Sequence, residues 1–152
     1  MRQVAQIEVP ANPDIFRVHQ FIYPGAPGIK GVGEKLMENI RDEIVEYPSR
    51  CILRFYESLE PVSEPMPAKI SDRWAPHLTW WHLYWALQWP GPTLRKALPN
   101  GTQMGVLAMF TDIDRPVRVK LDWNEGHDLG KRPSEPGWAW NSGTIFIARE
   151  LL

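Results

Sequence analysis

This chain of 152 residues contains almost no cysteine: Cys51 is the only one. A single thiol excludes an intrachain disulfide and any zinc site built from cysteines. Cys51 opens the apolar run Cys-Ile-Leu, so we expect a buried structural thiol rather than a nucleophile. The sequence also has no GxSxG motif, and hydrolysis through a serine or cysteine nucleophile therefore has no support.

An excess of one charge sign is lacking too. The 17 Lys and Arg residues nearly balance the 18 Asp and Glu residues, so no global basic field recruits nucleic acid, although a local basic strip could. No stretch approaches the roughly 20 apolar residues of a membrane span, and the N-terminal segment lacks the apolar run of a signal peptide. The four histidines show no HxH or HxxxH spacing. We expect a cytoplasmic protein without a metal site, a cofactor or a membrane partner.

Tryptophan and proline are abundant, with 8 and 15 residues. Five tryptophans lie between Trp74 and Trp89, and the recurrence of Trp81, Trp85 and Trp89 at every fourth position predicts a helix. Its other sides are also apolar, so the helix is either sunk in the core or keeps one face for a partner. We expect Trp81 and Trp85 to be buried. The alternative is that this stripe is an exposed partner surface. Trp74 and Trp80 are separate candidates for contact with RNA or a partner.

The prolines keep the other elements short, and hydrophobic periodicity places them. The expected strands span residues 3–9, 43–47, 50–59, 104–111, 117–123 and 144–148, and the expected helices span 14–23, 33–39 and the tryptophan segment. Residues 25–33 are a linker or an anion-binding loop, and 94–100 and 124–137 are loops. This order predicts a single α+β domain over 1–152. Residues 1–123 form a ferredoxin-like (split βαβ) antiparallel sheet with helices on one face, and 124–152 add a loop and a terminal strand as a C-terminal β extension.

A basic cluster follows from the strand expected over 117–123. Arg118 and Lys120 alternate with apolar residues, so they share the outward face of this strand. Arg115 lies in the turn before it, and Lys131 and Arg132 lie in the next loop. The cluster is either a solvated strand face or a contact for RNA phosphates or an acidic protein surface.

Residues 11–23 (ANPDIFRVHQFIY) are similar to the opening helix of the Cas6e (CasE) family of CRISPR RNA-processing endonucleases. Residues 49–61 resemble the strand that follows in that family, and 97–120 resemble a later, glycine-containing strand, although this chain has no arginine over 106–110. The resemblance covers scattered parts of the first 120 residues. It implies that His19 is the catalytic histidine, with Tyr23 lining the same site. A ribose 2′-OH would then attack the adjacent phosphate without a metal.

Two classes of function remain open. The first is an RNA-binding, Cas6e-like protein, with or without metal-independent RNA cleavage. The second is a non-enzymatic protein-interaction factor, such as a small inhibitor encoded by a phage or mobile element (anti-CRISPR-like) that blocks a host complex. In the second class, His19 is a structural histidine among the apolar residues around it. Whether the protein is an enzyme therefore stays open, and its partner is RNA or a host protein complex.

Overall fold

The structure is a computed structural model, and it describes residues 1–63, 77–108, 116–133 and 135–151. The strands are β1 Arg2–Val9, β2 Phe16–Arg17, β3 Ile29–Val32, β4 Ile44–Val45, β5 Cys51–Glu57, β6 His77–Leu78, β7 Gln103–Ala108, β8 Val117–Lys120, β9 His127–Lys131 and β10 Ile145–Leu151. The helices are the short 3₁₀ turn η1 Val18–Gln20 and the α-helices α1 Glu34–Ile40, α2 Trp80–Gln88 and α3 Gly91–Ala97. The protein is therefore α+β.

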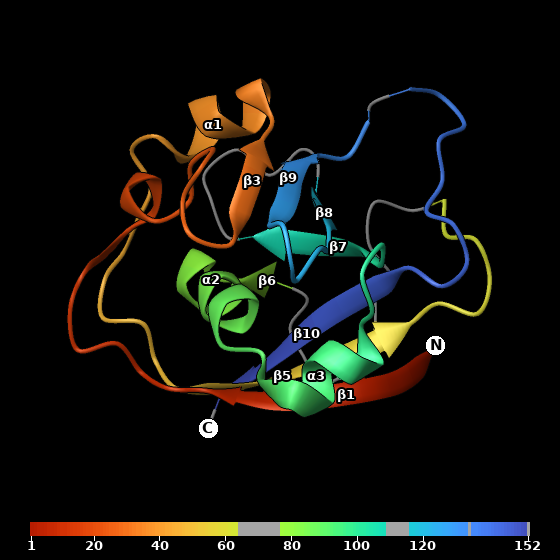
Figure 1. Ribbon diagram of the computed structural model, residues 1–152, viewed down its shortest axis with the longest axis horizontal. Coiled ribbons are helices and arrows are strands. Elements are labelled where there is room, and N and C mark those ends of the chain that lie inside the picture. Colours follow the sequence, from red (N-terminus) through yellow and green to blue (C-terminus); the bar gives the residue numbers. More distant parts are fainter. Residues whose placement is uncertain (64–76, 109–115, 134, 152) are drawn as a thin grey trace.

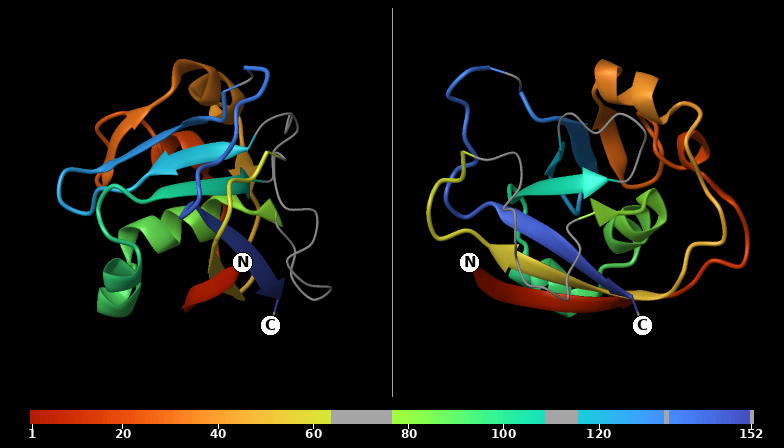
Figure 2. Two further views of the ribbon diagram at one scale, coloured as in Figure 1. Left: turned by 90° about the vertical axis from the view of Figure 1, so that its right-hand side faces the viewer. Right: turned by 180° about the vertical axis from the view of Figure 1, so that it is seen from behind.

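Seven strands form one mixed sheet in the order β1-β5-β10-β7-β8-β9-β3, and β6 pairs with β7 beside this path. β2 and β4 form a separate two-stranded sheet. The large sheet curls so that α2 lies between the half made of β1, β5 and β10 and the half made of β7, β8, β9 and β3 (Figure 1; Figure 2). In the part of the chain that the structure describes, no helix is both long and apolar enough to span a bilayer.

The main core fills the concave side of the sheet around α2. Alternate residues of each strand point into it, as the pleat requires, and β5 contributes Leu53 and Phe55. From α2, Trp80, Leu83 and Leu87 pack into the same core, at spacings of three and four residues. Thr79 caps this helix, since its hydroxyl oxygen accepts the backbone N–H of His82.

A second, aromatic core covers the convex side of the sheet. Phe146 lies between two residues of β10 that face the main core, so it points to the opposite side, where it meets Trp140 edge-on at 5.6 Å between ring centroids. Both side chains are fully buried. They lie directly on Gly105 of β7, where an added Cβ would stand 2.8 Å from the Phe146 ring and 3.1 Å from Trp140. The centre of the sheet is thus buried on both faces.

Several expected elements are present. The structure confirms an α+β fold, the first strand as β1, the helix over 33–39 as α1, and the strands over 50–59, 117–123 and 144–148 as β5, β8 and β10. The strand expected over 43–47 is reduced to β4, and the strand over 104–111 is confirmed as β7 as far as Ala108. These segments carry clear alternation or helical spacing, and their local pattern agrees with the surrounding fold.

The helix expected over residues 14–23 is wrong. β2 and η1 occupy this segment instead. The side chain of Asn12 does accept the N–H of Asp14, at 3.1 Å, but no helix follows the turn that this bond closes. Val18 then donates its N–H to the carbonyl of Glu43, which ties the segment to the chain leading into β4. Pairing with another segment has overridden the local helix signals.

Three expected loops contain regular structure. β3 lies within residues 25–33, β9 within 124–137, and α3 ends at Ala97, inside the segment expected to be a loop. The two strands are short and glycine-containing, so they show little hydrophobic alternation. β3 also pairs with β9 in parallel, as β10 does with β7, whereas the sequence predicted an antiparallel sheet. The ferredoxin-like topology is not confirmed.

The tryptophan helix is confirmed as α2, but His77 and Leu78, in the segment expected to be helical, form β6 instead. A different stripe of the helix is also deepest. Trp80 is 0% exposed, whereas Trp81 and Trp85, which we expected to be buried, are only partly buried against the core, and Trp89 is 53% exposed. A helix that is apolar on most sides offers two possible core stripes, and the approach of the sheet decides between them. Trp80 is therefore a core residue and not the partner contact expected from the sequence.

Candidate anion-binding face

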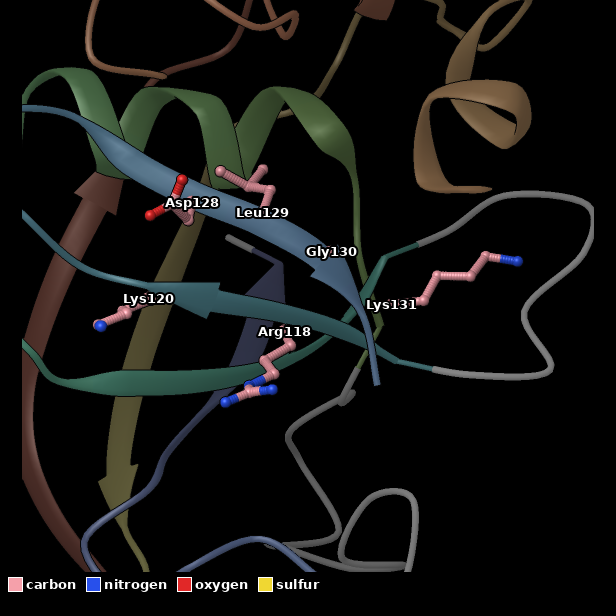
Figure 3. Close-up of a pocket in the computed structure, with 6 residues that line it drawn as sticks. All are labelled: Arg118, Lys120, Asp128, Leu129, Gly130 and Lys131. Atoms are coloured by element: carbon pink, nitrogen blue, oxygen red, sulfur yellow. The ribbon is translucent and has the colours of Figure 1, made fainter. Parts of the chain in front are cut away.

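Arg118 and Lys120 stand on the convex side of the sheet, on strand β8. Val117 and Val119, which alternate with them, are fully buried in the main core, so the pleat directs both cations to the opposite side. Arg118 is half-buried and Lys120 is exposed. Figure 3 shows both side chains extending from the same side of β8. The outward basic pair expected from the sequence is confirmed.

Strand β9 completes a pocket beside this pair. In the antiparallel register, Lys120 lies opposite Asp128, and Arg118 lies opposite Gly130. A Cβ built on Gly130 would meet nothing within 4 Å, so the floor of the pocket is open backbone. The residues that line the pocket are Arg118, Lys120, Asp128, Leu129, Gly130 and Lys131 (Figure 3). Among the described residues of this lining, Arg118 and Lys120 extend from the same side of β8 and outnumber the one carboxylate, Asp128, which favours an anionic ligand.

The other expected cations take separate positions. Lys131 lies opposite Val117 in the register, and its side chain points away from Arg118 and Lys120 (Figure 3). Arg132 lies just beyond β9, where it donates hydrogen bonds to the carbonyl oxygens of Pro133, at 3.1 Å, and Trp138, at 3.0 Å. Arg132 therefore anchors the chain that follows β9.

An indole ring joins this anchor to the pocket. The guanidinium carbon of Arg132 lies 4.6 Å from the ring centroid of Trp138, and that of Arg118 lies 5.9 Å from the same centroid. The same indole packs edge-to-face with Trp140, with 4.9 Å between ring centroids. The convex aromatic core thus supports Arg118 through Trp138, by contacts between cation and ring.

The turn between β8 and β9 fixes their register. The carboxylate of Asp122 accepts the N–H groups of Asn124 and Glu125, both at 3.0 Å, and these bonds lower the pKa of Asp122. The ring Nδ1 of His127 accepts the N–H of Asp122 at 3.0 Å. His127 is buried, and this burial lowers its pKa below the usual value, so the ring is neutral and able to accept. Lys120 is thereby held opposite its partner on β9.

The structure does not enclose the residues expected to be catalytic. His19 lies in η1 and Tyr23 follows it, and both are exposed. Their spacing of four residues would place them on one side of a helix, but the chain is not α-helical here. Neither residue lines the pocket beside Arg118. Two other expected contact residues, Arg115 and Trp74, lie outside the described residues.

A second surface candidate is formed by α2 and the chain after η1. We call Phe21, Tyr84, Trp85 and Trp89 the aromatic ridge. Tyr84 contacts Phe21 at 5.3 Å and Trp89 at 5.8 Å between ring centroids, and Trp85 lies 5.9 Å from Trp89. Phe21 is 37% exposed and Trp89 is 53% exposed. Such a cluster at the surface is a candidate contact for a protein partner.

Three residues of this face were not predicted: Asp128 and Gly130 lie in the stretch expected to be a loop, and Trp138 directly follows it. The only local signal is the alternation of Trp138 and Trp140, which is typical of an extended segment with one apolar face. Among the described residues, no group of three or more His, Cys, Asp or Glu side chains could hold a metal ion. No family model, curated protein or solved structure matches the chain significantly.

Proposed function

We propose that this protein binds RNA on the convex face of β8 and β9, with the phosphate backbone against Arg118 and Lys120. One observation carries the proposal: both cations line an open-floored pocket, and within the described residues neither forms an ion pair with a carboxylate. Cations that are not neutralised by neighbouring carboxylates remain available to phosphate oxygens.

The balance of charges sets the character of this binding. The chain as a whole carries a formal charge of −1, so attraction to RNA has to come from the local cations. Such binding falls steeply with salt, since each neutralised phosphate releases counterions. Trp138 adds an aromatic ring beside the basic strand, and the combination of cations with aromatic rings is typical of surfaces that bind single strands.

Charge reversal tests the proposal. We expect Arg118→Glu with Lys120→Glu to bind a fluorescein-labelled 20-nucleotide single-stranded RNA at least tenfold more weakly, measured by fluorescence anisotropy at 50 mM salt. The matched control is Arg41→Glu with Lys96→Glu, which makes the same change of charge at two exposed positions on other elements. Equal affinity in wild-type protein and the charge-reversed variant contradicts the proposal.

Two parts of the Cas6e-like hypothesis go beyond RNA binding. They are cleavage of the RNA and a ferredoxin-like relationship of the fold. The cleavage hypothesis rests on His19 and Tyr23, with His19 acting as general base or acid. If it is right, wild-type protein cleaves a hairpin RNA in EDTA, and His19→Ala lowers the rate by about 10²–10⁴-fold while RNA binding is kept. Absence of cleavage by wild-type protein removes the enzymatic hypothesis and leaves RNA binding in place.

The aromatic ridge favours a second candidate, the protein-interaction factor that blocks a host complex in the manner of an anti-CRISPR protein. Aromatic side chains at the surface are the commonest energetic centres of protein interfaces. In this case Trp89→Ser with Phe21→Ser abolishes co-elution with the purified host complex, whereas the charge-reversed variant of Arg118 and Lys120 still co-elutes. The opposite pattern rejects the ridge as the binding surface.

A further inference from the structure

Among the described residues that line the basic pocket, Asp128 is the one carboxylate, and its position is unusual. It lies directly opposite Lys120 on the neighbouring strand, yet the two side chains form no ion pair. Its carboxylate instead leans over β3, on the other side of β9. A Cβ built on Gly31 would stand 2.8 Å from Oδ1 of Asp128, so the missing side chain at Gly31 makes room for this carboxylate.

This arrangement separates two chemical functions on one face. Lys120 and Arg118 are donors suited to phosphate, and Asp128 is an acceptor that phosphate does not need. An ionised carboxylate in a phosphate-binding pocket repels its ligand unless the ligand also offers a hydrogen-bond donor. The donor that accompanies every phosphate in RNA is the ribose 2′-OH, which DNA lacks.

The spacing suits this assignment. Adjacent strands of a sheet are about 4.8 Å apart. Asp128 lies one strand from Lys120 and its carboxylate leans further, toward β3, so we place the ribose next to the phosphate that Lys120 holds on this side of the pocket. The side chains also extend on different sides of the pocket, with Asp128 apart from Arg118 and Lys120 (Figure 3). The bare backbone at Gly130 lets a nucleotide approach the strands between them. Dinucleotide-binding folds use an acidic side chain for ribose hydroxyls in the same way.

We propose that Asp128 accepts a hydrogen bond from the ribose 2′-OH of the bound strand and so makes the pocket selective for RNA over DNA. This inference rests on the proposed binding of RNA at Arg118 and Lys120, and it adds the residue that identifies the sugar. Asp128 is then a specificity-determining residue, and the phosphate contacts supply most of the affinity.

The test compares a single-stranded RNA with a DNA of the same length and sequence that contains deoxyuridine in place of uridine, by anisotropy. We expect wild-type protein to bind the RNA about tenfold more tightly, as one hydrogen bond to a charged group allows. Asp128→Ala brings this ratio close to one without weakening the binding of DNA, since a negative charge is lost. Asp128→Asn keeps part of the preference, because its amide oxygen still accepts. The control Asp42→Ala removes an exposed carboxylate elsewhere and leaves the ratio unchanged.

A second variant moves the carboxylate without removing it. Gly31→Ala places a methyl group 2.8 Å from the present position of Oδ1 of Asp128, which is too close for the carboxylate to stay there, and we expect this variant to reduce the preference for RNA while circular dichroism stays as in wild type. Equal binding of RNA and DNA by wild-type protein overturns the role of Asp128 and leaves the proposed function standing. A preference that survives in Asp128→Ala overturns it as well. Failure to bind either strand overturns the proposed function itself.

Discussion

Two glycines on the convex face give a sharp test of the packing that supports the pocket. Gly105 on β7 pairs with Arg118 on β8, which in turn pairs with Gly130 on β9, so both glycines lie in one row across the sheet. Their surroundings are opposite. An added Cβ meets the Phe146 ring at 2.8 Å on Gly105 and nothing within 4 Å on Gly130. Replacing each by alanine therefore probes a filled and an empty site with the same chemical change.

The magnitude follows from the contacts. Gly→Ala in a strand lowers the entropy of the unfolded chain and stabilises by about 0.4–1 kcal/mol at both positions. At Gly105 the methyl group also stands about 1 Å closer to the ring than an ordinary carbon contact of 3.5–4.0 Å. Phe146 and Trp140 are both 0% exposed, so neither ring can swing into solvent to relieve the overlap. Overpacking of this kind costs about 1–3 kcal/mol.

We expect Gly105→Ala to unfold at lower urea concentration than wild type and Gly130→Ala at the same or slightly higher concentration. Tryptophan fluorescence follows the transition, and an unchanged m-value shows that only stability has changed. In thermal unfolding, the two variants should differ in Tm by roughly 3–10 °C for a chain of this size. Equal midpoints for the two variants contradict a close-packed aromatic core on the convex face, and with it the support of Arg118 through Trp138.

Two further predictions concern the core. Trp80→Ala should reduce the free energy of unfolding by about 3–5 kcal/mol, and Trp89→Ala by less than about 1 kcal/mol. The reason is that the Trp80 side chain is 0% exposed and that of Trp89 is 53% exposed. Equal losses of stability in urea denaturation would contradict the orientation of α2. Burial lowers the pKa of both His82 and His127 in the folded state below the ordinary value of 6.5. The unfolded state therefore binds more protons as the pH falls below about 6.5, and the free energy of unfolding drops by up to about 1.4 kcal/mol per pH unit for each histidine, whereas it is flat above about pH 7.5. Urea denaturation at pH 8, 6 and 5 measures this slope. If the double variant His82→Gln with His127→Gln shows the same slope as wild type, other groups cause the acid sensitivity.

Elements with a strong local pattern could be predicted from the sequence. Alternation identified β1, β5 and β8, and it placed Arg118 and Lys120 on one outward face. The period of two fixes the face of a side chain whatever strand lies beside it, which is why this part of the site was predictable. The tryptophan helix was also predictable, because the spacing of its apolar residues is helical.

Features that depend on pairing between distant segments could not be predicted. The helix signals at Asn12 were overridden by pairing with a distant segment, where Val18 donates its N–H to the carbonyl of Glu43. Asp128 and Gly130 became part of the site only through the register of β9 on β8, and β9 carries little alternation of its own. The choice of Trp80 over Trp81 as the deepest residue of α2 depends on how the sheet curls around the helix, which no periodicity reports.

The most direct test of RNA binding at Arg118 and Lys120 is the salt dependence of affinity. The dissociation constant for a single-stranded RNA is measured from 25 to 300 mM salt, a range over which screening by salt increases strongly. The proteins compared are wild type and the double variant Arg118→Gln with Lys120→Gln. For single strands the slope of log affinity against log salt changes by about 0.7 for each phosphate contact. We expect the variant to lose about 1.4 of the wild-type slope and to bind RNA with lower affinity. Parallel salt plots for the two proteins contradict it, because they place the phosphate contacts elsewhere.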